Sequence, residues 1–434
     1  MDHFQRNAQG VLAAEEVSLK DIAKEYGTPT FVYAKATIER HVRVLREGVK
    51  DVPHSLCYAI KANSNLAILE TLAGLGCDFD AVSIGEFVQA LKAGAKPEQV
   101  ILSGVGKRDD EMRSALKWGA RYICVESIEE LKALEQIACH EKVCAPVAVR
   151  VNPDVDAKTH PYIATGLKQN KFGVAWNQVH ELYRWGQERS ALSLIGVTCH
   201  IGSQLTTMDP FIDAAKRIGV LAGELLERGV PLRDVGMGGG LGIPYTYENP
   251  PTPKEYGQAL SDILKPLGLN LVLEPGRVIV GNAGILLAKV VRIKEGSERV
   301  FVILDAGMND LIRPALYQAT HRLEKVEVSA ANHAVVDVVG PICESADTFL
   351  EQESLGSMEC GDLVALRSSG AYASVMASHY NGRPHVAEIL VDGKRAQLIK
   401  KRESIADLWR GEFHLQGDAA DSTYPLETGS IDDE

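Results

Sequence analysis

Lys61 is the residue of this 434-residue chain that is best placed for covalent chemistry. It ends the apolar segment HSLCYAI and directly precedes the polar turn at 62–65. This position predicts a lysine at the C-terminal tip of a buried strand, with its amine at the mouth of a parallel sheet. A low dielectric constant there disfavours the ammonium ion, so we expect a free amine that attacks carbonyl groups. Because most strand-end lysines simply reach solvent, the hypothesis depends on the neighbouring groups.

Three other strand ends carry groups that complement such an amine. The run GMGGGLG at 236–242 offers backbone N–H groups for a compact phosphate, and it lacks the Lys-Ser/Thr of a nucleotide-binding P-loop. Glu274 either pairs with Arg277 or holds a heteroaromatic nitrogen in its protonated state. His200 is either a hydrogen-bonded core histidine or a ring that lies flat against an aromatic group.

A carbonyl for Lys61, a phosphate for the glycines and a ring nitrogen for Glu274 are the three functional groups of pyridoxal 5′-phosphate. These three requirements are independent, and they meet at one predicted site. The sequence therefore predicts this cofactor and no metal ion.

The elements that must position these residues alternate between strand and helix. Segments of helical period lie at 68–75, 84–93, 112–118, 128–137, 210–226 and 256–264. Apolar runs bounded by turn residues predict eight strands, at 56–60, 79–83, 101–104, 122–127, 147–152, 196–202, 234–239 and 271–276. Eight strands over roughly 220 residues favour a closed (β/α)8 barrel over an open sheet, with the C-terminal strand ends forming the active-site face.

Beyond about residue 280 the pattern changes to alternating strands without long helices, at 285–293, 300–305, 334–339, 363–367 and 387–391. The strand at 30–33 is expected to join them. We predict an α/β barrel at 35–280 and a discontinuous antiparallel β domain, a sandwich or barrel, at 1–34 and 281–414. The segment 415–434 has six acids and no lysine or arginine, which indicates a solvated, disordered tail.

Seven strings occur in an order that resembles one known family. They are YAIKAN, HIGSQ, GGGLGI, EPGR, MNDLIRPALYQA, GPICES and Gly370-Ala-Tyr372, and the resemblance extends from about Tyr26 to about Leu415. They are similar to the motifs of the diaminopimelate decarboxylases, which belong to the alanine-racemase-like class (fold type III) of pyridoxal-phosphate enzymes. The resemblance implies decarboxylation of meso-2,6-diaminopimelate to L-lysine and carbon dioxide, the last step of lysine biosynthesis.

The resemblance also implies a role for each candidate residue. Lys61 would hold the cofactor aldehyde covalently, His200 would stack on its ring and Glu274 would face the pyridine nitrogen. Cys343 would be the acid that returns a proton to the product carbanion. The remaining cofactor contacts are implied for Ser203, Gly239, Gly240, Gly276, Arg277 and Tyr372. Substrate contacts are implied for Arg277, Arg313, Tyr317, Glu344 and Tyr372.

The opposite charges of Arg313 and Glu344 indicate which charges the distal group of the substrate carries. A distal group that carries both an ammonium and a carboxylate requires both charges, whereas ornithine-type substrates require acids alone. Arginine suits the carboxylate because its planar fork pairs bidentately. This favours diaminopimelate and leaves open carboxynorspermidine, another basic amino acid, an amino-acid racemase, or a non-catalytic relative that binds partners.

Cys343, Glu344 and Tyr372 belong to the predicted β domain, so a complete site needs domain contact or a second subunit. The resemblance implies a homodimer with shared active sites, which fits the commonest oligomer symmetry. A net charge of −12 argues against nucleic acid and anionic membranes as partners. We expect a cytoplasmic protein, because no apolar stretch approaches a membrane span, no signal peptide is evident, and the eight cysteines lack C-x-x-C spacing.

Overall fold

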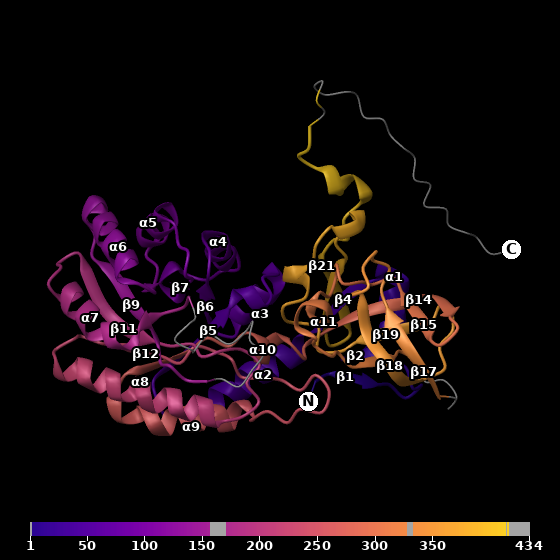
Figure 1. Ribbon diagram of the computed structural model, residues 1–434, viewed down its shortest axis with the longest axis horizontal. Coiled ribbons are helices and arrows are strands. Elements are labelled where there is room, and N and C mark those ends of the chain that lie inside the picture. The colour runs from indigo at the N-terminus through magenta and orange to yellow at the C-terminus, as the bar shows by residue number, and fades with distance from the viewer. Residues whose placement is uncertain (1, 157–170, 328–332, 414, 416–434) are drawn as a thin grey trace.

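Eight parallel strands close into a barrel in the described part of the chain (Figure 1). The computed structural model describes residues 2–156, 171–327, 333–413 and 415. The strands are β5 (His54–Ala59), β6 (Asp78–Ala81), β7 (Val100–Leu102), β8 (Tyr122–Val125), β9 (Ala145–Asn152), β11 (Leu192–Thr198), β12 (Asp234–Gly236) and β13 (Asn270–Leu273). The ring closes because β9 pairs with both β8 and β11 while β13 pairs with β5. The predicted (β/α)8 barrel is confirmed.

Helices surround this barrel. They are α2 (Lys35–Gly48), α3 (Leu66–Gly74), α4 (Ile84–Lys92), α5 (Asp109–Trp118), α6 (Ile128–Glu141), α7 (Val179–Gln187), α8 (Asp209–Glu227) and α9 (Pro253–Leu264). Two of them, α2 and α7, were not predicted. Helix α2 precedes the first barrel strand and packs against α9, so the N-terminal side of the chain contributes to the helical ring. A Cβ on Gly48 would lie 2.8 Å from the carbonyl oxygen of Lys254, so glycine allows the close approach.

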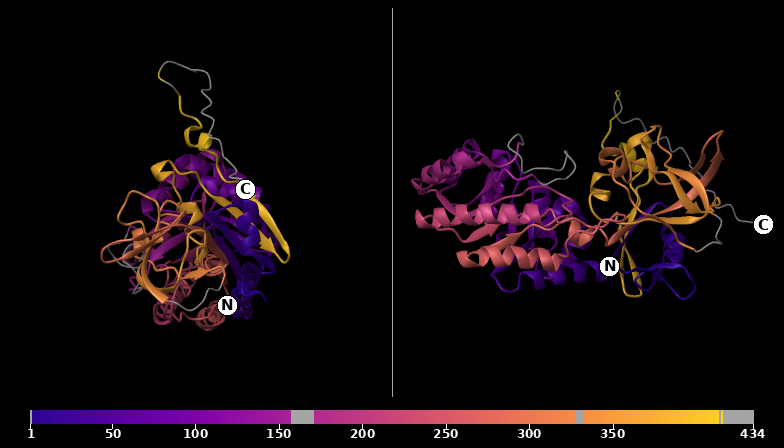
Figure 2. Two further views of the ribbon diagram at one scale, coloured as in Figure 1. Left: turned by 90° about the vertical axis from the view of Figure 1, so that its right-hand side faces the viewer. Right: turned by 60° about the horizontal axis from the view of Figure 1, so that its bottom comes forward.

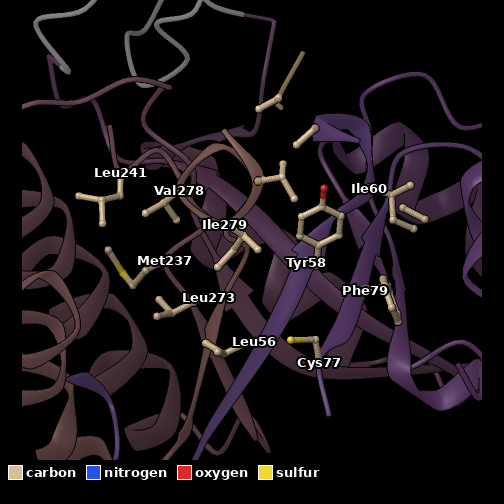
Figure 3. Close-up of a cluster of buried hydrophobic side chains, with 14 of the residues drawn as sticks. Leu56, Tyr58, Ile60, Cys77, Phe79, Met237, Leu241, Leu273, Val278 and Ile279 are labelled. Carbon is tan, nitrogen blue, oxygen red and sulfur yellow. The ribbon is translucent and has the colours of Figure 1, made fainter. Parts of the chain in front are cut away.

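Side chains of the barrel strands alternate between two environments, as the period of two requires. Leu56 and Tyr58 of β5 point into the large apolar core that includes helix side chains, and Figure 3 shows Leu56 near Leu273 of the neighbouring strand. Cys57, between them, belongs instead to a separate cluster with residues of other barrel strands. Arg121 pairs with Asp78 and Asp234, which begin β6 and β12, so this charged group occupies the N-terminal end of the barrel. The C-terminal strand ends are left to form the site.

A second sheet lies beside the barrel, and its order is β18-β17-β15-β14-β4-β20-β21 (Figure 2). These strands are β4 (Thr30–Ala34), β14 (Gly284–Glu295), β15 (Val300–Leu304), β17 (His333–Val339), β18 (Thr348–Gly356), β20 (Ala387–Asp392) and β21 (Arg395–Lys400), and β19 (Leu363–Leu366) pairs with β14 and with β16 (Leu323–Lys325). Most pairs are antiparallel, as predicted, although β15–β17 and β4–β20 are parallel. Strand β4 joins this sheet between β14 and β20, as expected from the sequence.

The N-terminal segment adds a small sheet and a helix to this second domain. They are β1 (Phe4–Arg6), β2 (Leu12–Ala14), β3 (Val17–Ser18) and α1 (Leu19–Tyr26). None of the described helices combines the length and the apolar character that a membrane crossing requires. Apart from Leu415, the acidic segment 415–434 lies outside the described residues.

Candidate active site

A cavity of about 220 Å³ lies where the barrel mouth meets the β domain. Eleven of the thirteen predicted site residues line it, namely Lys61, His200, Ser203, Gly239, Gly240, Glu274, Gly276, Arg277, Arg313, Tyr317 and Tyr372. A second cavity, of about 470 Å³, shares Lys61, His200 and Glu274 with the first. A larger one, of about 1020 Å³, includes Trp176 and Glu181 and contains none of the thirteen. The predicted chemistry and this larger cavity are therefore in different places, and the barrel mouth is the candidate site.

Lys61 lies in the short helical turn Ile60–Ala62 that follows β5. Its Nζ is 3.1 Å from Oδ2 of Asp80, a carboxylate at the end of β6 that is 1% exposed. Burial lowers the pKa of Lys61, but Asp80, Tyr372 and Glu274 together raise that pKa above its ordinary value. The expectation that burial alone leaves a free amine is therefore wrong, because the ion pair holds Lys61 as an ammonium ion. Since 41% of its side chain is exposed and it borders both cavities, the amine remains accessible to a ligand.

The glycine run lines the same cavity as this amine. A Cβ on Gly239 would lie 2.3 Å from the carbonyl oxygen of Glu274, and one on Gly240 would lie 2.3 Å from that of Gly202. Only glycine fits at either position, because another backbone segment packs against it, and both residues line the cavity. The Gly239 N–H donates to Nδ1 of His200 at 3.2 Å, which orients that ring. These features fit a phosphate-bearing aromatic cofactor, because a cradle without side chains adjoins a fixed flat ring.

The pKa values of His200 and Glu274 are both strongly shifted. Burial, reinforced by the positive charges of Arg150 and Lys61, lowers the pKa of His200 well below its usual value. The imidazole is therefore neutral, which suits stacking on a ring. Burial raises the pKa of Glu274 to about 8, and Asp80 adds to the rise while Lys61 and Arg150 oppose it. A cationic ring nitrogen beside Glu274 would favour its ionised form.

Two arginines enter the cavity from short helices, α10 (Arg277–Val280) and α11 (Arg313–Tyr317). Arg277 donates to the Tyr245 hydroxyl at 2.5 Å and to Oγ of Ser203 at 2.9 Å. The Arg313 guanidinium lies 5.0 Å from the centroid of the Tyr245 ring and 5.6 Å from that of Tyr317. The four-residue spacing of Arg313 and Tyr317 places them on one helical turn, with Pro314 at its start.

Both guanidiniums are buried, with Arg277 5% and Arg313 4% exposed. Among the described residues neither forms an ion pair with a carboxylate, and the Nε of each has no hydrogen-bond partner. Burial and the charge of Arg277 lower the pKa of Arg313, against the opposing effect of the nearby tyrosines. Two buried cations without an acid are costly, and an anionic ligand would offset that cost. Glu274 is not the partner of Arg277, so its alternative interpretation as a plain ion-pair residue is wrong.

Tyr372 connects the β domain to the lysine turn. Its backbone N–H donates to the carbonyl of Ala62 at 2.8 Å, and the Arg277 guanidinium lies 4.8 Å from its ring centroid. Its φ of 54° is in the left-handed region, which is strained for a tyrosine. The neighbouring Asn63 donates to the Gly370 carbonyl at 3.1 Å, so two contacts fix this junction.

Cys343 and Glu344 are not brought to the cavity within one chain. Both are exposed on the loop after β17. The Cys343 N–H donates to Oδ1 of Asn381 at 2.9 Å, and the Tyr380 hydroxyl donates to Glu344 at 2.5 Å. Their supply across a subunit interface stays a prediction.

Sequence reasoning missed Asp80 and Tyr245 as members of the site. Asp80 lies within the second predicted strand, at 79–83, and the register Ala59↔Asp80 sets it beside the end of β5. A signal was therefore present, since adjacent parallel strands end together. Tyr245 follows the glycine run in the string GIPY, where nothing in the sequence indicates that two arginines flank it.

A closed barrel whose mouth combines a lysine and a glycine run in one cavity, beside a β domain, is the architecture of a pyridoxal-dependent decarboxylase. The family model described as "Pyridoxal-dependent decarboxylase, pyridoxal binding domain" matches residues 35–281. The chain is 48% identical to the diaminopimelate decarboxylase of Vibrio cholerae and 48% to that of Pseudomonas aeruginosa, in each case over 96% of this chain and 100% of the relative. This chain belongs to the diaminopimelate decarboxylase family, and the prediction of pyridoxal 5′-phosphate as cofactor is confirmed.

Solved structures agree with this assignment. The crystal structure of diaminopimelate decarboxylase from Helicobacter pylori complexed with L-lysine has a TM-score of 0.88 at 42% identity, and covers 91% of this chain and 99% of its own. The enzyme from M. jannaschii, in co-complex with L-lysine, has a TM-score of 0.91 at 36% identity, with coverage of 95% and 98%. The likeness extends over both domains, because nearly the whole of each chain is covered.

Proposed function

We propose that this chain decarboxylates meso-2,6-diaminopimelate to L-lysine and carbon dioxide. The observation that carries this proposal is the pair of buried guanidiniums, Arg277 and Arg313, beside Lys61 and without a carboxylate partner among the described residues. The cofactor phosphate and the substrate would supply anions near Arg277, and a second, distal carboxylate on the substrate would supply the anion for Arg313. The full-length relatives named diaminopimelate decarboxylase and the two neighbours solved with L-lysine support the same reaction.

Residues of the barrel mouth would hold the cofactor. Lys61 would attach its aldehyde, His200 would stack on its ring and Glu274 would face its nitrogen. When bound, pyridoxal 5′-phosphate supplies an electron-withdrawing ring that stabilises negative charge at the substrate α-carbon. The phosphate would lie against the backbone of Gly239, Gly240 and Gly276, with Ser203, Arg277 and Tyr372 completing its surroundings.

Proton handling follows from the local charges. The ion pair with Asp80 favours the protonated form of Lys61, so this lysine must give up a proton before its amine attacks a carbonyl. Glu274, in contrast, must be deprotonated when the cofactor ring is bound, because its negative charge stabilises the protonated ring nitrogen. Its pKa, raised to about 8, lets it lose its proton when a cationic ring nitrogen binds beside it.

Substrate recognition would be divided between the domains. Arg313 and Tyr317, on one turn of α11, would bind the distal carboxylate, and Arg277 and Tyr372 would border the reacting end. Glu344 would bind the distal ammonium, and Cys343 would return a proton to the α-carbon. Since these last two residues are exposed on their own chain, we propose a homodimer in which each subunit completes the other's site.

The domain limits at 35 and 281 and the cytoplasmic location remain proposals as well. The pairing of β4 with β14 and β20 supports the first limit, because residues 30–34 belong to the β domain. Eight free cysteines, four of them buried, support a reducing compartment.

An assay of carbon dioxide release tests the substrate assignment. The panel consists of meso-diaminopimelate, ornithine, arginine and carboxynorspermidine, and we expect release from the first alone. Arg313 would be misassigned if only ornithine or arginine reacted. Interconversion of amino-acid enantiomers without carbon dioxide release would indicate a racemase, and binding without any turnover would indicate a non-catalytic relative.

A further inference from the structure

Two histidines and a glutamate converge at the edge of the β domain, outside the cavity described above. His379 Nε2 lies 2.6 Å from Oε2 of Glu403, and His385 Nδ1 lies 3.3 Å from the other oxygen, Oε1. The imidazole rings stack with centroids 4.1 Å apart and planes inclined by 30°. One ligand atom from each of the three residues lies within 4.8 Å of the other two.

This arrangement differs from an ordinary histidine–carboxylate pair. His180 and Glu224 form such a pair elsewhere, at 2.9 Å, with a single imidazole. At Glu403 two imidazoles contact one carboxylate. The backbone N–H of His385 also donates to this carboxylate at 2.9 Å, which restricts its orientation. Nε2 of His385 is buried without a hydrogen-bond partner among the described atoms, but so is Nδ1 of His180, so the second imidazole and the backbone N–H are what set the Glu403 site apart. A carboxylate held in place and two adjacent imidazoles provide more ligand capacity than one shared proton requires.

Imidazole nitrogen and carboxylate oxygen are ligands of divalent transition metals, Zn²⁺ above all, with bonds of about 2.0–2.2 Å. We propose that His379, His385 and Glu403 form a binding site for such an ion. The spacing H-x5-H-x17-E matches no compact zinc motif, and the cysteines gave no indication of a metal, so the sequence alone predicted none. The site is formed by folding, which brings the segment after β21 against the segment before β20.

An ion at this position would also affect the loop that carries Cys343 and Glu344. His379 is followed by Tyr380, which bonds Glu344, and by Asn381, which bonds the backbone of Cys343. An ion that ties His379 to Glu403 therefore restrains the segment on which both loop contacts depend. The metal site does not itself rest on the roles proposed for Cys343 and Glu344.

Zinc titration of the cofactor-loaded, chelator-stripped protein tests the site, with a chromophoric chelator as competitor. We expect the unmodified chain to bind one more Zn²⁺ than His385→Gln or Glu403→Gln, or to bind it at least tenfold more tightly. The matched control is His180→Gln, which removes an imidazole from a single-histidine pair and is expected to leave zinc binding unchanged. Circular dichroism and the visible absorbance of the cofactor verify that each variant is folded.

X-ray absorption at the zinc edge provides the second readout, because exposed thiols such as Cys139 and Cys144 also attract zinc. We expect a shell of nitrogen and oxygen at about 2.0–2.1 Å without sulfur. Equal stoichiometry and affinity in the unmodified chain and both variants would overturn the site, as would sulfur ligation of the bound ion. Neither measurement involves turnover, so failure here is distinguishable from failure of the proposed decarboxylation.

Discussion

The Nζ atom of Lys61 lies 3.1 Å from the buried carboxylate of Asp80, across the first two strands of the barrel. The other carboxylate oxygen of Asp80, Oδ1, is buried and has no hydrogen-bond partner among the described atoms. The Lys61 amine is therefore protonated. Reaction with a carbonyl depends on how readily that proton leaves.

Asp80→Asn is expected to shift the reactivity of Lys61 toward lower pH. Asp80 contributes the largest attraction that raises the pKa of Lys61, so removing its carboxylate leaves the lowering effect of burial opposed only by Tyr372 and Glu274. The rate at which cofactor-free protein captures pyridoxal 5′-phosphate, followed by visible absorbance against pH, should move to the acid side by about one pH unit or more. An unchanged pH profile would show that Asp80 does not control the amine.

Glu274→Gln should change the pH dependence of stability in the cofactor-free protein. The folded-state pKa of Glu274 is about 8 and its ordinary value is 4.5, so the folded chain binds more protons between those limits. Stability of the unmodified chain therefore falls as pH rises through this window. The variant has no carboxyl group to deprotonate at this position, so it does not lose stability in this way. Its unfolding free energy, relative to that of the unmodified chain, should therefore rise by on the order of a few kcal/mol between pH 5 and pH 8. A difference that does not vary with pH, measured by denaturant unfolding, would contradict the assignment.

Tyr245→Phe is expected to raise the KM for diaminopimelate roughly tenfold, the equivalent of about 1.4 kcal/mol. The tyrosine hydroxyl accepts a hydrogen bond from Arg277, and its ring lies against the Arg313 guanidinium. Its loss frees Arg277 to rotate, whereas the visible absorbance of the bound cofactor should persist. Tyr247→Phe is the matched control, because that side chain is 97% exposed. Lower thermal stability with an unchanged KM would assign Tyr245 a structural role only.

Mixing two inactive variants tests whether the subunits share active sites. Lys61→Ala and Cys343→Ala are each expected to lose activity. A mixed dimer contains one site that combines an intact Lys61 with the partner's intact Cys343, so co-expression should restore up to about one quarter of the activity. If both residues act within one chain, co-expression restores none.

The sequence predicted the barrel well because each strand is an apolar run that ends in chemically unusual residues. Helix α7 was not predicted, and neither was α2, whose apolar residues Ile38, Val42 and Leu45 are interspersed with many charges. The alternation that identified the β domain could not show that two of its strand pairs are parallel, because register and direction depend on long-range pairing.

The candidate site was predictable at the strand ends and less so elsewhere. The protonated state of Lys61 was misjudged because burial was considered without the strand register that brings Asp80 to it. Tyr245 and the His379–His385–Glu403 cluster could not be recognised, since their partners are distant in sequence. Cys343 was expected on a loop and is found on one, but a single chain leaves it outside the cavity.

The central claim is that Lys61 holds the cofactor covalently, and borohydride reduction of the cofactor-loaded protein followed by peptide mass spectrometry tests it most directly. We predict that the mass of the reduced pyridoxal phosphate is found on the peptide containing Lys61, and that Lys61→Ala abolishes the labelling. Labelling of a different lysine, or none in a folded and cofactor-saturated sample, would contradict the account.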